Sequence, residues 1–491
     1  MTTRRDLLLA AAAAAFAAPF AAGAQTLSQF RAKPPGPGYR LPSPTPAPAD
    51  PWAEAERIVQ RIKPTRFPDR DFPVTRYGAD DEAVADSTDA FRQAIAACSA
   101  AGGGRVLVPA GEYLTGPIHL KSNVNLHLAE GAVVRFKTDP KAYLPLVFTR
   151  WEGIELMNYS PFVYAIDQQN IAITGKGTFD GQCSREHWWS WKGPWKQQQH
   201  GWREGMPDQR KSRAVLFQMA EDDVPVAQRR FGEGHYLRPP FIQTYRCDRV
   251  LIEGVSLRRS PFWQVHPVLC TNIVVRGLNI DSHGPNNDGL DPESCRDMLV
   301  EDCYFSTGDD CIALNSGRNN DGRRLNRAAE NIVVRNCRMA DGHGGLTIGS
   351  QISGHSRNVF FEKCQLDSPG LNTAIRFKNN ALRGGVVENI FFRDITVGQV
   401  ARSVIEVDFN YEEGRAGGFT PVLRNVVIDN LTVGKAPMAA DLEGFETAPI
   451  YDITVRNSRF NGVTGPSTVK NVRGLKLENV VVNGRPVTTL A

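Results

Sequence analysis

The chain contains 491 residues, 41% of them hydrophobic, which is enough to bury a core larger than that of one ordinary compact domain. A formal net charge of +4, from 57 Lys and Arg against 53 Asp and Glu, is too small to indicate a nucleic-acid partner and is compatible with an anionic substrate. Two domains or one long repeat structure remain possible on these grounds.

Residues 1–24 are typical of an export signal. Arg4 and Arg5 precede an apolar run over residues 7–22, and Ala22, Gly23 and Ala24 supply the small residues of a cleavage site. The paired arginines favour the twin-arginine type, which exports folded proteins, although an ordinary Sec signal can also contain two arginines. A transmembrane anchor is the weaker alternative, because the run is short and alanine-rich. We expect a periplasmic or secreted protein that has no membrane contact after signal removal.

A proline-rich segment over residues 25–70 separates the signal from the domain expected over residues 71–491. Its part over residues 33–51 contains eight prolines, which predict an extended, solvated chain without a core of its own. A helix is predicted over residues 88–101, with Thr88 as its cap, three glycines as its end, and one apolar face formed by Phe91, Ala94, Ile95 and Cys98. We expect this helix to cover the open end of the first coil.

Short runs of β-branched and aromatic residues recur from Asp248 onward, at intervals of 23 to 36 residues. A second short strand follows many of them, and the turns are rich in Gly, Asn, Asp and Ser. An elastic period of this kind predicts stacked coils, and therefore an all-β parallel β-helix with an N-terminal capping helix. A leucine-rich repeat is the alternative, but the coils lack its leucine consensus. Cys303, Cys337 and Cys364 share one position of the repeat, so we expect buried free thiols rather than disulfides.

Candidate catalytic residues occur on consecutive coils. Asp288 lies in the sequence Asn-Asn-Asp-Gly and Asp310 in Gly-Asp-Asp, 22 residues later, so both are expected on one face of adjacent coils. His343 lies on a later coil. Arg376 and Lys378 flank an inward-pointing phenylalanine on a further strand, and so project together.

Crowded aspartates suit glycoside hydrolysis, which needs one protonated carboxylic acid and one ionised carboxylate. Like charges raise one another's pKa values until one carboxyl stays protonated. Two cations nearby suit a substrate that carries a carboxylate on every sugar. Each feature alone is weak, because Asp-Asp pairs, single histidines and Arg-x-Lys strands are commonly structural. Their order and coil spacing together favour catalysis.

With these motifs the sequence resembles the polygalacturonases of glycoside hydrolase family 28. The family's Asn-x-Asp-Gly, Gly-Asp-Asp, Gly-His-Gly and Arg-Ile-Lys motifs match residues 286–289, 308–310, 342–344 and 376–378, in the family's order, with Phe377 and Asn287 as departures. The resemblance runs from about Phe72 to the final coils. It implies a right-handed parallel β-helix and hydrolysis of α-1,4-galacturonosidic bonds with inversion, without metal or cofactor.

The resemblance also implies residue roles. Asp309 would be the general acid, Asp288 and Asp310 would position and deprotonate the water, and His343 would tune the acid or hold the substrate. The residues expected to bind galacturonan are Arg376, Lys378, Tyr411 and Asn286. For inversion we expect acid and base carboxyls about 6.5 to 9.5 Å apart. The expected partner is an anionic polysaccharide or oligosaccharide, the expected state is a monomer, and no nucleic acid is expected.

An insertion over residues 182–240 interrupts the repeat and holds five of the eight tryptophans: Trp188, Trp189, Trp191, Trp195 and Trp202. We expect it to close one end of the cleft and make the enzyme exo-acting, with tryptophan faces stacking on sugars and Arg203 and Lys196 meeting a terminal carboxylate. The alternative is that these tryptophans only pack the insertion against the coils.

Two other functions remain open on the same scaffold. A calcium-dependent pectate lyase could use Asp288, Asp309 and Asp310 as a cation cage, but this reading leaves His343 and the motif order unexplained. A non-catalytic carbohydrate-binding β-helix would not need a carboxylate cluster.

Overall fold

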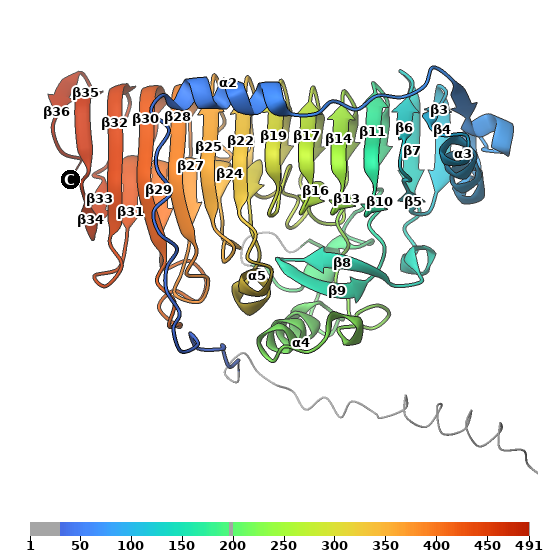
Figure 1. The fold of residues 1–491 in the computed structure, drawn as a ribbon, viewed down its shortest axis with the longest axis horizontal. Helices are drawn as coiled ribbons and strands as arrows, with labels where there is room; N and C mark the ends of the chain where they lie inside the picture. The colour runs from blue at the N-terminus through green and yellow to red at the C-terminus, as the bar shows by residue number, and fades with distance from the viewer. Residues whose placement is uncertain (1–29, 196–199, 491) are drawn as a thin grey trace, which may run out of the picture. The chain divides into compact units, whose positions relative to one another are not determined.

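Most of the described strands are parallel and stack coil upon coil (Figure 1). The computed structural model describes residues 30–195 and 200–490. Ala32–Ala491 forms one compact unit, and its described part is a parallel β-helix, as predicted. None of the described helices is long and apolar enough to cross a membrane.

Three ladders of strands form the walls of the β-helix. The first contains β1 (Asp71–Pro73), β3 (Gly104–Val108), β6 (Val124–Leu128), β11 (Gln169–Gly175), β14 (Asp248–Glu253), β17 (Thr271–Arg276), β19 (Arg296–Glu301), β22 (Ala329–Arg335) and β25 (Ser356–Glu362). The second contains β2 (Glu82–Asp86), β4 (Gly111–Thr115), β7 (Ala132–Phe136), β12 (Thr178–Asp180), β15 (Ser256–Arg258), β18 (Asn279–Ser282), β20 (Tyr304–Thr307), β23 (Arg338–Met339) and β26 (Gln365–Leu366). The two are joined by the long strands β28 (Val386–Gln399), β30 (Val422–Lys435) and β32 (Ile450–Phe460), and end at β34 (Val472–Arg473), β35 (Lys476–Val482) and β36 (Arg485–Val487).

The third ladder carries the motif residues. It contains β5 (Ile118–His119), β10 (Val163–Ile166), β13 (Ile242–Tyr245) and β16 (Val265–Val268), then β21 (Ile312–Leu314), β24 (Gly342–Ile348), β27 (Leu371–Lys378), β29 (Ser403–Asp408), β31 (Met438–Glu443) and β33 (Thr468–Lys470). Between the two groups, Leu290 bridges Val265 on one side and Ile312 on the other. The wall therefore continues through the coil that contains Asp288.

Register between coils stacks like residues on like. In the first ladder each member of one inward-facing column pairs with the next: Ile173, Ile252, Val275, Val300, Val334, Phe361, Phe392, Ile428 and Val455. Every residue of this column is buried, because alternate side chains of a strand face the interior. All nine cysteines are free and buried, which confirms the expectation of buried free thiols rather than disulfides.

Four α-helices are described, where the sequence indicated one. Helix α3 (Thr88–Ala100) is the predicted helix, and it packs its apolar face on the first coils. Its N-cap residue is Ser87 rather than Thr88. The others are α2 (Pro51–Arg61), α4 (Arg210–Glu221) and α5 (Asn319–Leu325). Helix α2 begins inside the proline-rich segment, where Asp50 caps it, and packs Ile58 against Phe360 and its neighbours outside the coils (Figure 1).

The insertion is folded against the β-helix rather than extended from it. It contains the short 3-10 helices η4 (Trp189–Lys192) and η5 (Val226–Gln228) together with α4. The antiparallel hairpin of β8 (Val147–Trp151) and β9 (Ile154–Asn158) lies beside α4 and α5. Two further 3-10 helices, η2 (Val74–Tyr77) and η3 (Pro140–Tyr143), belong to the first coils.

Candidate active site

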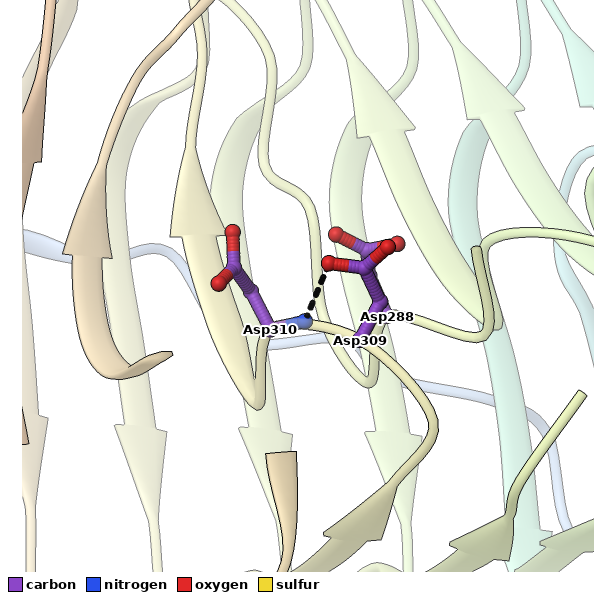
Figure 2. A group of neighbouring side chains, drawn as sticks. All are labelled: Asp288, Asp309 and Asp310. Carbon is purple, nitrogen blue, oxygen red and sulfur yellow. Dashed lines mark hydrogen bonds between the residues drawn. The ribbon is translucent and has the colours of Figure 1, made fainter. Parts of the chain in front are cut away.

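Asp288, Asp309 and Asp310 lie close together on the third wall, on two adjacent coils (Figure 2). Asp288 lies two residues before Leu290, and Asp310 two residues before Ile312, the partner of Leu290 in the wall. The two carboxylates are therefore in register, as the 22-residue spacing predicts. Asp309 lies beside Asp288, and its Oδ1 accepts a hydrogen bond from the Asp310 backbone N–H at 3.0 Å.

The carboxylates are closer together than predicted. One side-chain oxygen of each of Asp288, Asp309 and Asp310 lies within 4.8 Å of the others. The range expected for an inverting acid and base is about 6.5 to 9.5 Å. That expectation is wrong for this site, because Asp309 and Asp310 are adjacent in sequence, and Asp288 lies on the neighbouring coil, at the coil spacing of about 4.8 Å.

His343 contacts the carboxylate expected to be the acid. Its Nδ1 lies 2.9 Å from Asp309 Oδ1, and Asn286 Nδ2 donates to Asp309 Oδ2 at 3.4 Å. Gly344, the neighbour of His343, leaves room for the cluster, since a Cβ there would lie 2.8 Å from Asp310 Oδ1 and 2.2 Å from Thr347 Oγ1. The Gly-His-Gly sequence therefore supplies a hydrogen-bond partner for Asp309 and leaves space for the Asp310 carboxylate.

Arg376 and Lys378 project together from β27, and Phe377 enters the core as predicted. Both cations contact Asp310, Lys378 Nζ at 2.5 Å and Arg376 Nη1 at 3.4 Å, and Arg376 also donates to Glu406 at 3.0 Å. Tyr411 lies beside them, with its ring centre 5.1 Å from Lys378 Nζ. The two cations thus compensate the charge of a protein carboxylate as well as being candidates to bind a substrate carboxylate.

The environments of Asp288 and Asp309 shift their pKa values in opposite directions. Burial raises the pKa of Asp288 well above its usual range, and the charges of Asp309, Asp291 and Asp310 add to this. Burial also opposes ionisation of Asp309, but its ion pair with His343 and the nearby Lys378 and Lys192 lower its pKa. The charge of Asp309 in turn raises the pKa of His343, against the effect of burial. A proton is therefore held on Asp288, and another on His343 beside Asp309.

A fourth carboxyl, Asp291, belongs to the same cluster although it was assigned no role from the sequence. It is fully buried, and neither of its oxygens has a hydrogen-bond partner among the described residues. Burial, together with Asp310 and Asp309, raises its pKa well above the usual range. Asp291 is therefore a neutral acid beneath the site. Its position in the Asn-x-Asp-Gly-x-Asp stretch was a visible signal.

A cavity of about 310 Å³ opens over the aspartates. Its walls include seven of the eight predicted site residues: Asn286, Asp288, Asp309, Asp310, His343, Lys378 and Tyr411. Arg376 is not among the lining residues and lies behind Asp310. The insertion supplies a further wall through Lys192, Pro194, Trp195, Gln209, Arg210 and Arg213. The cavity is thus shared between the coils and the insertion.

The insertion's wall is held by partly buried ion pairs that no local sequence motif indicates. Arg213 of α4 pairs with Glu152 in the β8–β9 turn at 2.7 Å and with Glu412 at 3.2 Å. Arg318 contacts the same two carboxylates, and Arg383 pairs with Glu412 at 2.6 Å. These residues come from segments far apart in the sequence, so only the folded structure brings them together.

The tryptophans of the insertion divide between the two predicted roles. Trp188 is buried, and Trp189 and Trp191 pack against the main core, which confirms packing for these three. Trp195 is 37% exposed and lines the cavity. Trp202 lies under the guanidinium of Arg210, 5.4 Å from ring centre to Cζ. Arg203 is exposed and does not line the cavity, and Lys196 falls outside the described residues.

Several known proteins are similar to this chain in sequence and in fold. Residues 230–482 match the model of Glycosyl hydrolases family 28. A crystal structure of a hyperthermoactive exopolygalacturonase from Thermotoga maritima is 44% identical, covers 88% of this chain and 96% of its own, and superposes with a TM-score of 0.85. A probable polygalacturonase from Vitis vinifera is 28% identical, over 76% of this chain and 70% of its own. The chain therefore belongs to glycosyl hydrolase family 28.

Proposed function

We propose that the protein hydrolyses α-1,4-galacturonosidic bonds of polygalacturonate and acts from the end of the chain. The observation that carries this proposal is the cavity in which three aspartates and His343 meet a wall built by the insertion. The cations around it suit an anionic sugar polymer. Family membership and the likeness to the Thermotoga maritima exopolygalacturonase support the same substrate and the same mode.

The proposed mechanism is a single displacement. Asp309 and His343 share one proton across 2.9 Å, and Asp309 delivers it to the leaving glycosidic oxygen. A water molecule attacks the anomeric carbon and passes its proton to Asp310, whose charge Lys378 and Arg376 compensate until then. Asp288 Oδ1 has no hydrogen-bond partner among the described residues and can orient that water. One bond breaks, one forms, and the configuration inverts.

The position of the insertion favours exo action, that is, cleavage of sugars from the end of the polysaccharide. An endo-acting β-helix leaves its groove open at both ends, whereas Lys192, Trp195, Arg210 and Arg213 of this chain stand at the cavity that holds the catalytic carboxylates. Viscometry with reducing-end assays tests the proposal. We expect slow loss of viscosity for the number of bonds cleaved, and rapid loss at low cleavage would show an open cleft.

A calcium-dependent lyase is the second candidate, because three carboxylates could hold a cation. The positive groups that already contact them argue against it: Lys378 and Arg376 at Asp310, and His343 at Asp309. Chelator treatment and ultraviolet absorbance separate the two. Hydrolysis predicts full activity after chelation and no unsaturated product.

We also propose that the protein acts as a monomer after export to the periplasm or beyond. Nine buried free thiols suit a protein that folds before it meets an oxidising compartment, which is what twin-arginine export provides. Replacing Arg4 and Arg5 by lysine should block such export, and unchanged export would indicate the Sec route. Light scattering of the mature protein measures its molar mass, which should be that of one chain.

A further inference from the structure

Lys192 is a cation of the cavity that forms no ion pair with any of the described residues. It is the last residue of η4, and among the described residues its Nζ has no hydrogen bond or ion pair. The Nζ lies over the Trp195 ring, 4.3 Å from the ring centre. The other cations of the cavity are paired. Arg213 contacts Glu152, Arg210 contacts Asp208, and Lys378 contacts Asp310.

This ammonium group is also poorly solvated. Burial, with smaller contributions from the neighbouring Arg238 and Arg213, lowers the pKa of Lys192 to about 8, although the charges of Glu152 and Asp309 act in the opposite direction. A half-buried charge without a partner is unfavourable unless a ligand supplies the opposite charge. The local environment therefore favours an anion beside Lys192.

The fold puts Lys192 and Lys378 on different sides of the catalytic coil. Trp189 of η4 donates from Nε1 to the Ser260 carbonyl at 2.8 Å, and Ser260 precedes β16, on the N-terminal side of the Asp288 coil. Lys378 lies on β27, which follows β21 and β24 on the C-terminal side. Since every sugar of galacturonan carries one carboxylate, the sugars on the two sides of a scissile bond between these cations each bring one carboxylate that a cation can bind.

We infer that Lys192 Nζ binds the carboxylate of the non-reducing terminal galacturonate and thereby selects a free-acid sugar at the closed end of the cavity. The inference rests on the proposed function. Trp195, beside Lys192, offers a flat face to the same sugar. Because Lys192 and Asp309 line the same cavity of about 310 Å³, the terminal sugar is the one next to the cleaved bond, and the product is monogalacturonate.

Two trigalacturonates test the inference, one with all carboxylates free and one methyl-esterified only at its non-reducing end. Wild type should cleave the ester with kcat/KM about 10- to 100-fold lower, since a hydrogen bond to a charged group is lost. Lys192→Met should lose the same factor on the free acid and show no further loss on the ester. Lys192→Arg should restore part of the discrimination. Lys176→Met, at an exposed lysine, is the control and should behave as wild type.

The outcomes separate the inference from the function on which it rests. Equal losses on both substrates in Lys192→Met, with wild-type discrimination retained, would overturn the carboxylate role, and so would unchanged kinetics. If wild type cleaved neither substrate, the proposed function would be wrong. Calorimetry with digalacturonate would then decide the inference alone, because only a Lys192 contact predicts weaker binding to Lys192→Met than to Lys176→Met.

Discussion

Lys378 offers a direct test of whether the cations of β27 hold the site together. Its Nζ lies 2.5 Å from Asp310 Oδ2, and the two side chains are only 7% and 1% exposed. Removing one partner of a buried pair leaves an uncompensated charge, which costs about 3–5 kcal/mol. The residual contact from Arg376 to Asp310, at 3.4 Å, places the expected cost for Lys378→Met at the lower end, about 3 kcal/mol.

The assay is a double-mutant cycle of Lys378→Met and Asp310→Asn, read by denaturant unfolding. The double variant should be much less destabilised than the sum of the single variants, because each single change leaves one buried group unpaired. Lys470→Met is the control, since its pair with Glu443 on the same wall is exposed and should contribute little. Additive effects, or a loss no larger than that of the control, would refute the pairing and leave Lys378 with substrate binding alone.

Four further predictions concern Asp291, the pair of Asp309 and His343, Lys192, and helix α2. Asp291→Asn mimics a neutral acid and should retain most activity, whereas Asp309→Asn should lose about 10²- to 10⁴-fold in kcat; a comparable loss in both would show that Asp291 acts ionised. Since Asp309 raises the pKa of His343, the stabilisation of their pair is present below about pH 6.5 and is lost as the pH rises through the raised value; NMR titration should show a lower His343 pKa in Asp309→Asn. Because an ammonium is needed at Lys192, kcat/KM should fall more steeply above about pH 8 in wild type than in Lys192→Arg, in which only the loss of the Asp309–His343 proton remains. Ile58→Ala, which empties a fully buried position of α2, should cost about 2–5 kcal/mol in unfolding without changing kinetics.

The sequence was sufficient for the features that repeat from coil to coil. Runs of β-branched residues fix a strand pattern with period two, and a 22-residue spacing places Asp288 and Asp310 in register. The buried free thiols and the inward position of Phe377 follow from the same periodicity. These predictions succeeded because each depends on one strand and its neighbour in the next coil.

Features that depend on contacts between distant segments could not be predicted. Lys192 has no motif around it, and Arg213 meets Glu152 only because α4 folds onto the β8–β9 turn. The close spacing of the carboxylates contradicts a rule drawn from other glycosidases, and the proton held on Asp288 depends on burial that no sequence shows. Helix α2 was missed because its prolines indicated an extended chain, whereas Pro51 occupies the first helical position.

Proton NMR of polygalacturonate during the first turnovers tests the central claim most directly, since one spectrum reports the bond cleaved, the size of the product and its configuration. Free monogalacturonate should appear first, and as the β-anomer. Carboxylates within 4.8 Å of one another would, by the usual spacing rule, favour retention of configuration. The anomer of the first product therefore discriminates between inversion and retention. An initial α-anomer would contradict single displacement, longer oligomers would contradict exo action, and unsaturated sugar signals would contradict hydrolysis itself.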